Sequence, residues 1–322
     1  MMKKSIFKVG FLTTLILILL VSCTSPAEET PAKLPAVSNK QKVANSSTLP
    51  DVYDVYDIPA YIGALHNASI YAFVDYVHEN NLSPFEVGGF TDGMIDTFAY
   101  NFVESNLLPV LENFEPTIEV STIILDALED EIMFAYDSVN GVDEINYEIQ
   151  ERVDYLYEVF AIEGDGVLVY DAIKEIAIAT NMLWGRNWDF TTPIFEIPDY
   201  ASDNDNEGEE NNDEKSEEEM RELKKADITG AVSGAWNGAE WGAEIAGPMG
   251  AVWGAIIGAS AGAVVASIVE YVAQEVVECA TCMSVEYINQ DTYLYNYLLT
   301  LHHTNPSKYY ALFGDKFDAV IY

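Results

Sequence analysis

The chain has 322 residues, enough for two domains, and carries 53 acidic against 15 basic residues for a formal net charge of −38. Between Lys42 and Arg152 there is no Lys or Arg at all. This charge excludes nucleic acid as a partner and makes anionic lipid headgroups poor ones, because like charges repel. A basic protein or a divalent cation would be attracted, although an acidic surface also simply keeps an exported protein soluble.

The N-terminus predicts export. Residues 1–23 combine three lysines among the first eight residues with an apolar stretch from Val9 to Leu20, the pattern of a signal peptide that is too short to span a bilayer alone. The segment ends in Leu20-Val21-Ser22-Cys23, which resembles the bacterial lipobox. That resemblance implies that Cys23 is acylated and becomes the mature N-terminus; the alternative is an ordinary secretory signal with an incidental cysteine. Residues 24–51, rich in Ser, Thr, Pro and Ala, are expected to form a flexible tether.

Five amphipathic segments predict an all-α helical bundle domain over residues 52–190. Their apolar residues recur every three or four positions, and no run of strand alternation appears. The segments extend from Pro59 to Asn80, onward from a cap at Thr91-Asp92, from Thr117 to Tyr136, from Ile145 to Phe160, and onward from Gly166. His66 lies on the apolar face of the first segment, where a hydrogen-bonded core histidine is more common than a metal ligand.

An acidic linker is predicted over residues 191–225. Pro193 and Pro198 break the helical pattern, and residues 203–222 hold eleven acids against two bases. The stretch 216–225 has its acids first and its bases last, so it can form a short helix that leads into the next segment.

The most informative segment is residues 226–275, in which glycine recurs every fourth residue. Residues i and i+4 share one helix face, so the ladder presents a groove almost free of side chains. Each glycine costs a helix roughly 1 kcal/mol relative to alanine, and the close approach of another helix would compensate for it. Ala246 takes one step of the series, and the glycines are Gly230, Gly234, Gly238, Gly242, Gly250, Gly254, Gly258 and Gly262.

The ladder breaks once, at Gly247-Pro248, as a helix end followed by a new helix start would. We therefore predict a Gly/Ala-rich helical hairpin, with Ala226–Ala246 packed face to face against Pro248–Val272. Residues 276–322 are expected to form a C-terminal helical segment with its aromatic cluster at 309–313 docked.

Whether the hairpin enters a membrane is left open by the sequence. Ile245–Val269 is 25 residues without a charge, about 37 Å of helix against a hydrocarbon core of about 30 Å. However, Asn237, Glu240 and Glu244 in the first arm oppose insertion of a lone helix. A spanning hairpin and a soluble hairpin packed on the helical domain are both consistent with this pattern.

No catalytic residue, metal site or cofactor is predicted, although three patterns were considered. Cys279 and Cys282 are spaced for a disulfide or another oxidisable pair, and a zinc site with His302 and His303 is a weaker alternative. Residues 203–214 approach a calcium-loop pattern, in a run so acidic that a near-match arises easily. Residues 258–262 match the hydrolase motif G-x-S-x-G, which requires a preceding strand that the helical repeat does not provide.

The hairpin resembles two families on the repeats Gly230–Gly242 and Gly250–Gly262. One is the glycine-zipper lipoproteins of Gram-negative envelopes, including the seventeen-kilodalton surface-antigen type, in which such repeats follow a lipobox. The other is the class II bacteriocins, whose membrane-active peptides carry Gly/Ala-rich helices. The chain departs from the first family by its large acidic helical domain, and from the second by its lipoprotein signal and its weak basic flank at Lys224-Lys225.

These features predict a non-enzymatic lipoprotein of the bacterial cell envelope, with the outer membrane or cell surface favoured. Its partners would be the membrane, through the lipid anchor, and a second copy of the chain or the bilayer, through the hairpin. The alternative is a bacteriocin-like membrane-active toxin or effector whose acidic helical domain restrains the hairpin.

Overall fold

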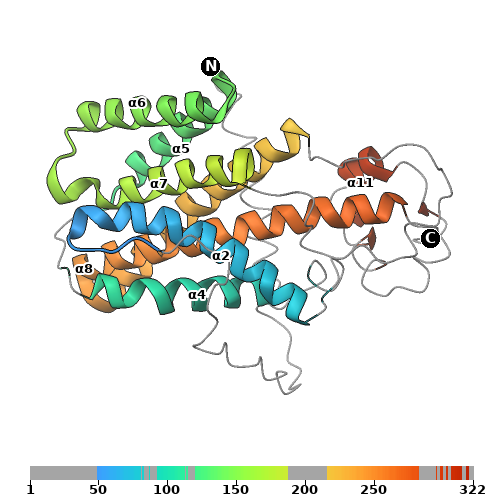
Figure 1. Ribbon diagram of the computed structural model, residues 1–322, viewed down its shortest axis with the longest axis horizontal. Coiled ribbons are helices and arrows are strands. Elements are labelled where there is room, and N and C mark those ends of the chain that lie inside the picture. Colours follow the sequence, from blue (N-terminus) through green and yellow to red (C-terminus); the bar gives the residue numbers. More distant parts are fainter. Residues whose placement is uncertain are drawn as a thin grey trace.

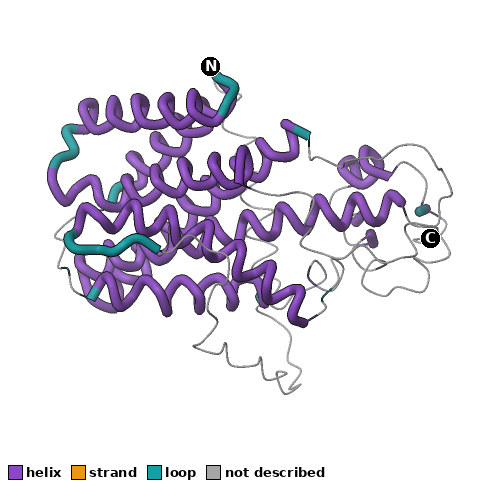
Figure 2. The backbone as a smooth tube through the Cα atoms, in the orientation of Figure 1, coloured by secondary structure: helices purple, strands orange, loops and turns teal. Residues whose placement is uncertain are grey.

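The computed structural model describes residues 49–80, 82, 87, 93–112, 114, 120–187 and 216–282, and, toward the C-terminus, 295, 298, 299, 302, 303, 306–313, 317 and 318. Within these residues every regular element is a helix and there is no strand, as the tube in Figure 2 shows. The predicted all-α class is therefore confirmed for this part of the chain.

The first two long helices run antiparallel. α2 (Ile58–Asn80) follows the short 3₁₀ helix η1 (Val55–Asp57), and α4 (Met94–Leu111) returns along it. The pairing is antiparallel because the Tyr61 hydroxyl donates to the Asn106 carbonyl at 3.0 Å while Phe73 meets Phe98 edge to face, 5.3 Å between ring centroids. The start of α2 and the end of α4 consequently lie at the same end of the molecule (Figure 1).

Three further helices complete the outer part of the bundle. They are α5 (Thr122–Ser138), α6 (Val142–Phe160) and α7 (Leu168–Met182), the last continued by a π-helical turn, Leu183–Asn187. α7 packs against both α2 and α6, and Tyr136 of α5 donates its hydroxyl to the Ala177 carbonyl of α7 at 2.9 Å.

Three acidic residues between Lys42 and Arg152, where there is no Lys or Arg, form ion pairs with basic residues outside that interval. Arg152 of α6 pairs with Glu131 at 2.6 Å and with Glu148 at 2.7 Å, and its guanidinium lies 3.9 Å from the centre of the Phe134 ring. Lys225 reaches Asp137 at 2.9 Å. These pairs are partly exposed and each stabilises the fold by about 1 kcal/mol or less.

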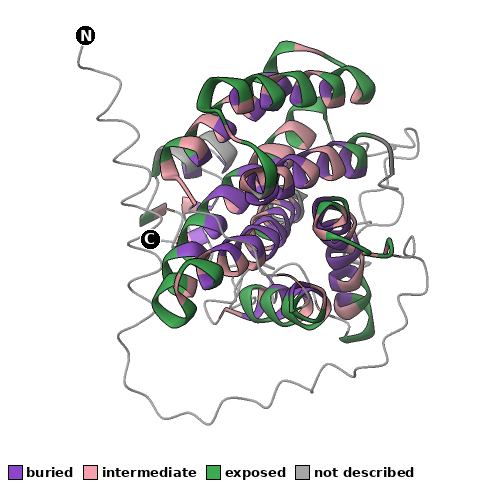
Figure 3. Cartoon of the chain, turned by 90° about the vertical axis from the view of Figure 1, so that its left-hand side faces the viewer, coloured by how far each residue is buried: buried purple, intermediate pink, exposed green. Residues whose placement is uncertain are grey.

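The longest helix, α8 (Glu217–Cys282), bends back on itself. Its backbone leaves the helical conformation at Ala246 and Gly247, and this break divides it into a first arm (217–245) and a second arm (248–282). The arms contact α2, α4, α5 and α7. Viewed along the bundle, buried residues of the arms face the centre of the molecule (Figure 3).

The two arms share one apolar core with the helices between residues 52 and 190. A single cluster of buried residues includes Ile62, Leu107 and Ile173 from those helices together with Ile228 and Ile256 from the arms. In this structure the hairpin at 226–275 is packed on the helices of residues 52–190, which is one of the two arrangements that the sequence left open. The physical reason is that the arms carry apolar side chains beside their glycine ridges, and a helix that is apolar on several faces is stable only when enclosed.

The helix continues on both sides of the hairpin. Residues 217–225, for which a short helix leading into the hairpin was predicted, form the first turns of α8 and bury Leu223. At the other end α8 continues to Cys282. A second core cluster holds Trp184, Tyr271 and Tyr309, and α11 (Pro306–Phe313) contributes its buried Tyr309 and Phe313 to it.

Candidate functional site: the glycine-lined hairpin

The turn of the hairpin depends on glycine. Gly247 has φ 67° and ψ −149°, a conformation that essentially only glycine adopts, and Ala246 before it has φ −133° and ψ 16°. Pro248 then opens the second arm, where its fixed φ suits the first turn of a helix and its missing N–H has no helical partner to lose. The dipeptide Gly247-Pro248 therefore both ends one arm and begins the other.

The eight ladder glycines meet in four pairs across the hairpin. A Cβ atom placed on any of them would lie less than 3.0 Å from the carbonyl oxygen of the glycine opposite, and the relation is reciprocal within each pair. The pairs are Gly230 with Gly262, Gly234 with Gly258, Gly238 with Gly254, and Gly242 with Gly250. Backbone thus touches backbone along the whole seam, and no residue with a side chain fits.

This seam has an attractive component as well as a steric one. The hydrogen that each glycine carries in place of a Cβ points at the opposite carbonyl oxygen. This is the arrangement of a Cα–H···O contact, which stabilises by about 0.5–1 kcal/mol. Eight such contacts offset much of the roughly 1 kcal/mol that each glycine costs its helix. Because each ridge is covered by the other arm, neither is available to a second molecule while the hairpin is closed.

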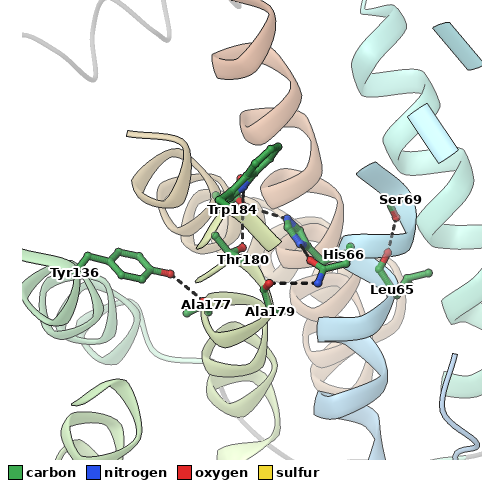
Figure 4. Close-up of polar contacts among 10 residues, drawn as sticks. Leu65, His66, Ser69, Tyr136, Ala177, Ala179, Thr180 and Trp184 are labelled. Carbon is green, nitrogen blue, oxygen red and sulfur yellow. Dashed lines mark hydrogen bonds and ion pairs between the residues drawn. The ribbon is translucent and has the colours of Figure 1, made fainter. Parts of the chain in front are cut away.

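A buried polar cluster ties the first arm to the bundle (Figure 4). Asp227 of the first arm and His66 of α2 are both fully buried, with 3.3 Å between His66 Nε2 and Asp227 Oδ2. The same carboxylate oxygen accepts hydrogen bonds from the Thr180 hydroxyl at 2.8 Å and the Trp184 indole N–H at 3.3 Å. Burial, with the nearby Asp227 carboxylate adding to it, raises the pKa of Tyr136 well above its usual value.

The sequence predicted that His66 lies in the core, but it did not predict which residue His66 contacts. It also did not identify Asp227 as a candidate residue. A signal was present, because Asp227 interrupts an i, i+4 series of buried first-arm residues that runs Leu223, Ala231, Ala235 and Ala239. The cluster is enclosed: His66 and Asp227 are fully buried. Neither belongs to the surface pocket lined by Tyr56, Leu168 and Asp171 or to the one lined by Leu49, Tyr61 and Phe114. It is therefore a packing feature rather than a substrate site.

The other candidate residues fall into three groups. Ser260 lies within α8, fully buried, and its hydroxyl donates to the Ile256 carbonyl at 2.9 Å, so the G-x-S-x-G match has no strand before it and no exposed nucleophile. Cys23 and the stretch 203–214 lie outside the described residues. Cys279 and Cys282 are in the last turns of α8, and their side chains are outside the described part. Among the residues that are described, no group of three or more His, Cys, Asp or Glu side chains is arranged to hold a metal ion.

Among the residues that the structure describes, one helix is long and apolar enough to cross a membrane: α8, over Glu217–Glu275. In the folded molecule 61% of its most apolar window is buried against the rest of the chain. Core helices of soluble proteins have the same properties, so this observation alone decides nothing about insertion.

Comparison of the chain with protein-family models, with curated proteins and with solved structures gave no match.

Proposed function

We propose that this chain is a non-enzymatic lipoprotein of a bacterial cell envelope, held at the outer membrane or cell surface by an acylated Cys23, whose glycine hairpin organises a helical bundle and brings it into contact with the membrane. The observation that carries the role of the hairpin is the reciprocal pairing of its glycines, Gly230–Gly242 against Gly250–Gly262. Of the two roles considered for the hairpin, this pairing favours membrane contact over self-association through the ridges, since the ridges already cover each other.

The buried polar residues support a structural role. His66, Thr180 and Trp184 all converge on Asp227 inside the core, and Ser260 bonds its own helix. These contacts satisfy the Thr180, Trp184 and Ser260 donors, which explains those residues without a reaction, whereas His66 Nε2 and Asp227 Oδ1 have no hydrogen-bond partner among the described residues.

The lipid anchor is tested by mass spectrometry of the mature N-terminus purified from membranes. We expect a peptide that begins at Cys23 and carries acyl chains, and we expect the Cys23→Ser variant to be recovered without them. A mature N-terminus at any other residue, or an unmodified Cys23, would end the lipoprotein proposal.

A second candidate function is a membrane-active effector whose hairpin leaves the bundle. The observation that favours it is the charge-free segment Ile245–Val269, long enough to span a bilayer and largely enclosed by the surrounding helices. In that case dye-loaded vesicles should leak when the protein is added, and leak faster with Asp227→Ala, which loosens the first arm. A stable lipoprotein instead leaves the vesicles intact with both proteins.

A further inference from the structure

The tip of the hairpin exposes large apolar side chains. Trp241 is 73% exposed, Ile245 79% and Met249 40%, on either side of the turn at Ala246-Gly247. Trp241 and Ile245 are four residues apart and share one face of the first arm. A soluble molecule gains nothing from exposing a tryptophan and an isoleucine together at a protruding turn, and contiguous exposed apolar groups of this kind mark contact sites.

The tip lies at the same end of the bundle as the start of α2 and the end of α4, near the first described residues. In Figure 1 the turn of α8 is at the left-hand end, where α2 begins and α4 ends. Leu49, the first described residue, lines a depression there with Pro109, Val110 and Phe114. The expected attachment point and the apolar tip are thus on the same side of the molecule.

The length of chain between Leu49 and Cys23 favours this end over the other. Residues 24–48 number 25, and a flexible chain of that length has a root-mean-square span of roughly 25–30 Å. The second arm, 248–282, is 35 residues long, or about 52 Å of helix. A tether shorter than the bundle keeps its own end of the bundle nearest to the membrane for most of the time.

From these observations we propose that the hairpin tip, made by Trp241, Ile245 and Met249, is a bilayer-contacting surface that dips into the headgroup boundary of zwitterionic phospholipid beside the anchor. This inference rests on the lipid anchor of the proposed function. Tryptophan is favoured at the membrane interface, and an apolar face there is buried about 5–10 Å. Exposed Glu240 and Glu244 lie within the tip itself, next in sequence to Trp241 and Ile245, so they keep its contact with the bilayer shallow and disfavour anionic lipid.

Depth-dependent fluorescence quenching tests the orientation. The acylated full chain is reconstituted into phosphatidylcholine vesicles with and without brominated acyl chains, as wild type, Trp241→Phe and Trp236→Phe. Trp236 is the matched control, because it is 38% exposed on the same arm but about 7 Å further from the tip. We expect bromolipid to quench the wild type and Trp236→Phe, and at least half of that quenching to disappear in Trp241→Phe. Equal quenching in all three proteins would overturn the proposal.

Vesicle flotation of the unacylated Cys23→Ser chain tests the tip without its anchor. Ile245→Asp should weaken binding to phosphatidylcholine vesicles about tenfold or more, because the isoleucine side chain that the bilayer would bury is lost. Ser233→Asp adds the same charge at an exposed position of the same arm, away from the tip, and should change binding less than twofold. Equal effects of both changes, or none from either, would refute a tip-specific contact.

The alternative occupant of the tip is a second copy of the chain. Size-exclusion chromatography with light scattering, without lipid, would then show a dimer that dissociates into monomers in Trp241→Phe or Ile245→Asp. That result would overturn the lipid proposal. A monomer throughout supports it. If mass spectrometry shows Cys23 unmodified, the proposed function fails, while flotation of the Cys23→Ser chain still decides whether the tip binds lipid.

Discussion

Replacing one ladder glycine by alanine should destabilise the protein even though it improves the helix. A Cβ at position 238 would lie less than 3.0 Å from both the carbonyl carbon and the carbonyl oxygen of Gly254, so the backbones must separate by about 1 Å or more to reach ordinary contact. Overpacking of this kind costs about 1–3 kcal/mol, and two Cα–H···O contacts of about 0.5–1 kcal/mol each are lost. Higher helix propensity returns about 1 kcal/mol. We therefore expect Gly238→Ala to lower the free energy of unfolding by about 1–4 kcal/mol.

The measurement is thermal unfolding of the soluble Cys23→Ser chain, followed by circular dichroism. One kcal/mol corresponds to roughly 2–4 °C in a large domain, so Gly238→Ala should lower Tm by roughly 2–16 °C. Asn237→Ala is the matched control: Asn237 is adjacent and exposed, so alanine there gains helix propensity and meets no other arm. If Gly238→Ala raised Tm as Asn237→Ala should, the arms would not touch at this seam.

Three further predictions concern charge. Asp227→Ala removes the acceptor shared by Thr180 and Trp184 and the carboxylate 3.3 Å from His66, so urea unfolding should show a loss of about 3–5 kcal/mol, with Asp227→Asn losing less because an oxygen remains. Burial raises the pKa of Glu175 above its usual value, opposed by the charge of Lys174 and helped by that of Asp171. The protonated Glu175 side chain therefore contributes stability below the pKa of the unfolded state, and this contribution is lost as the pH rises through the pKa of the folded state. Glu175→Gln should accordingly raise Tm at pH 7 and leave it unchanged near pH 4. Because the net charge is −38, Tm should rise when NaCl is increased from low concentration, and a flat salt series would show that the acids are too dispersed to repel one another.

Local patterns predicted the helices well because those patterns act locally. The spacing of apolar residues placed the first helix at 59–80 and the structure has it at Ile58–Asn80. The fourth segment, expected to end at Phe160, does so, where Ala161 adopts a left-handed conformation with φ 51°. Gly247-Pro248 marked the break between the arms, because few other dipeptides both stop a helix and start one.

The relation between distant segments was not predictable in the same way. Asp227 and His66 each interrupt an apolar stripe on their own helix, but nothing local says that the two interruptions meet. The acidic stretch before residue 217 suggested a boundary between two units, whereas Ile228 and Ile256 in the arms belong to the same core as Ile62 of α2. Pairing of that kind depends on the shapes of several helices at once, and a periodicity within one segment carries no information about it.

The seam of paired glycines repeats every four residues, so moving one arm along the other by four residues again brings glycines opposite glycines. If one arm slid by one step, Gly238 would leave Gly254 and face Gly258, with glycine again opposite glycine. A shift of one step keeps three of the four glycine pairs, because Gly230 would then face Ala266. The seam therefore fixes which faces meet and how closely, but it discriminates only weakly between alignments. The alignment of the hairpin must be set by parts that do not repeat, namely the turn at Gly247-Pro248 and the attachment of Asp227 to His66. Those two features therefore determine the register of two arms whose seam is otherwise uniform.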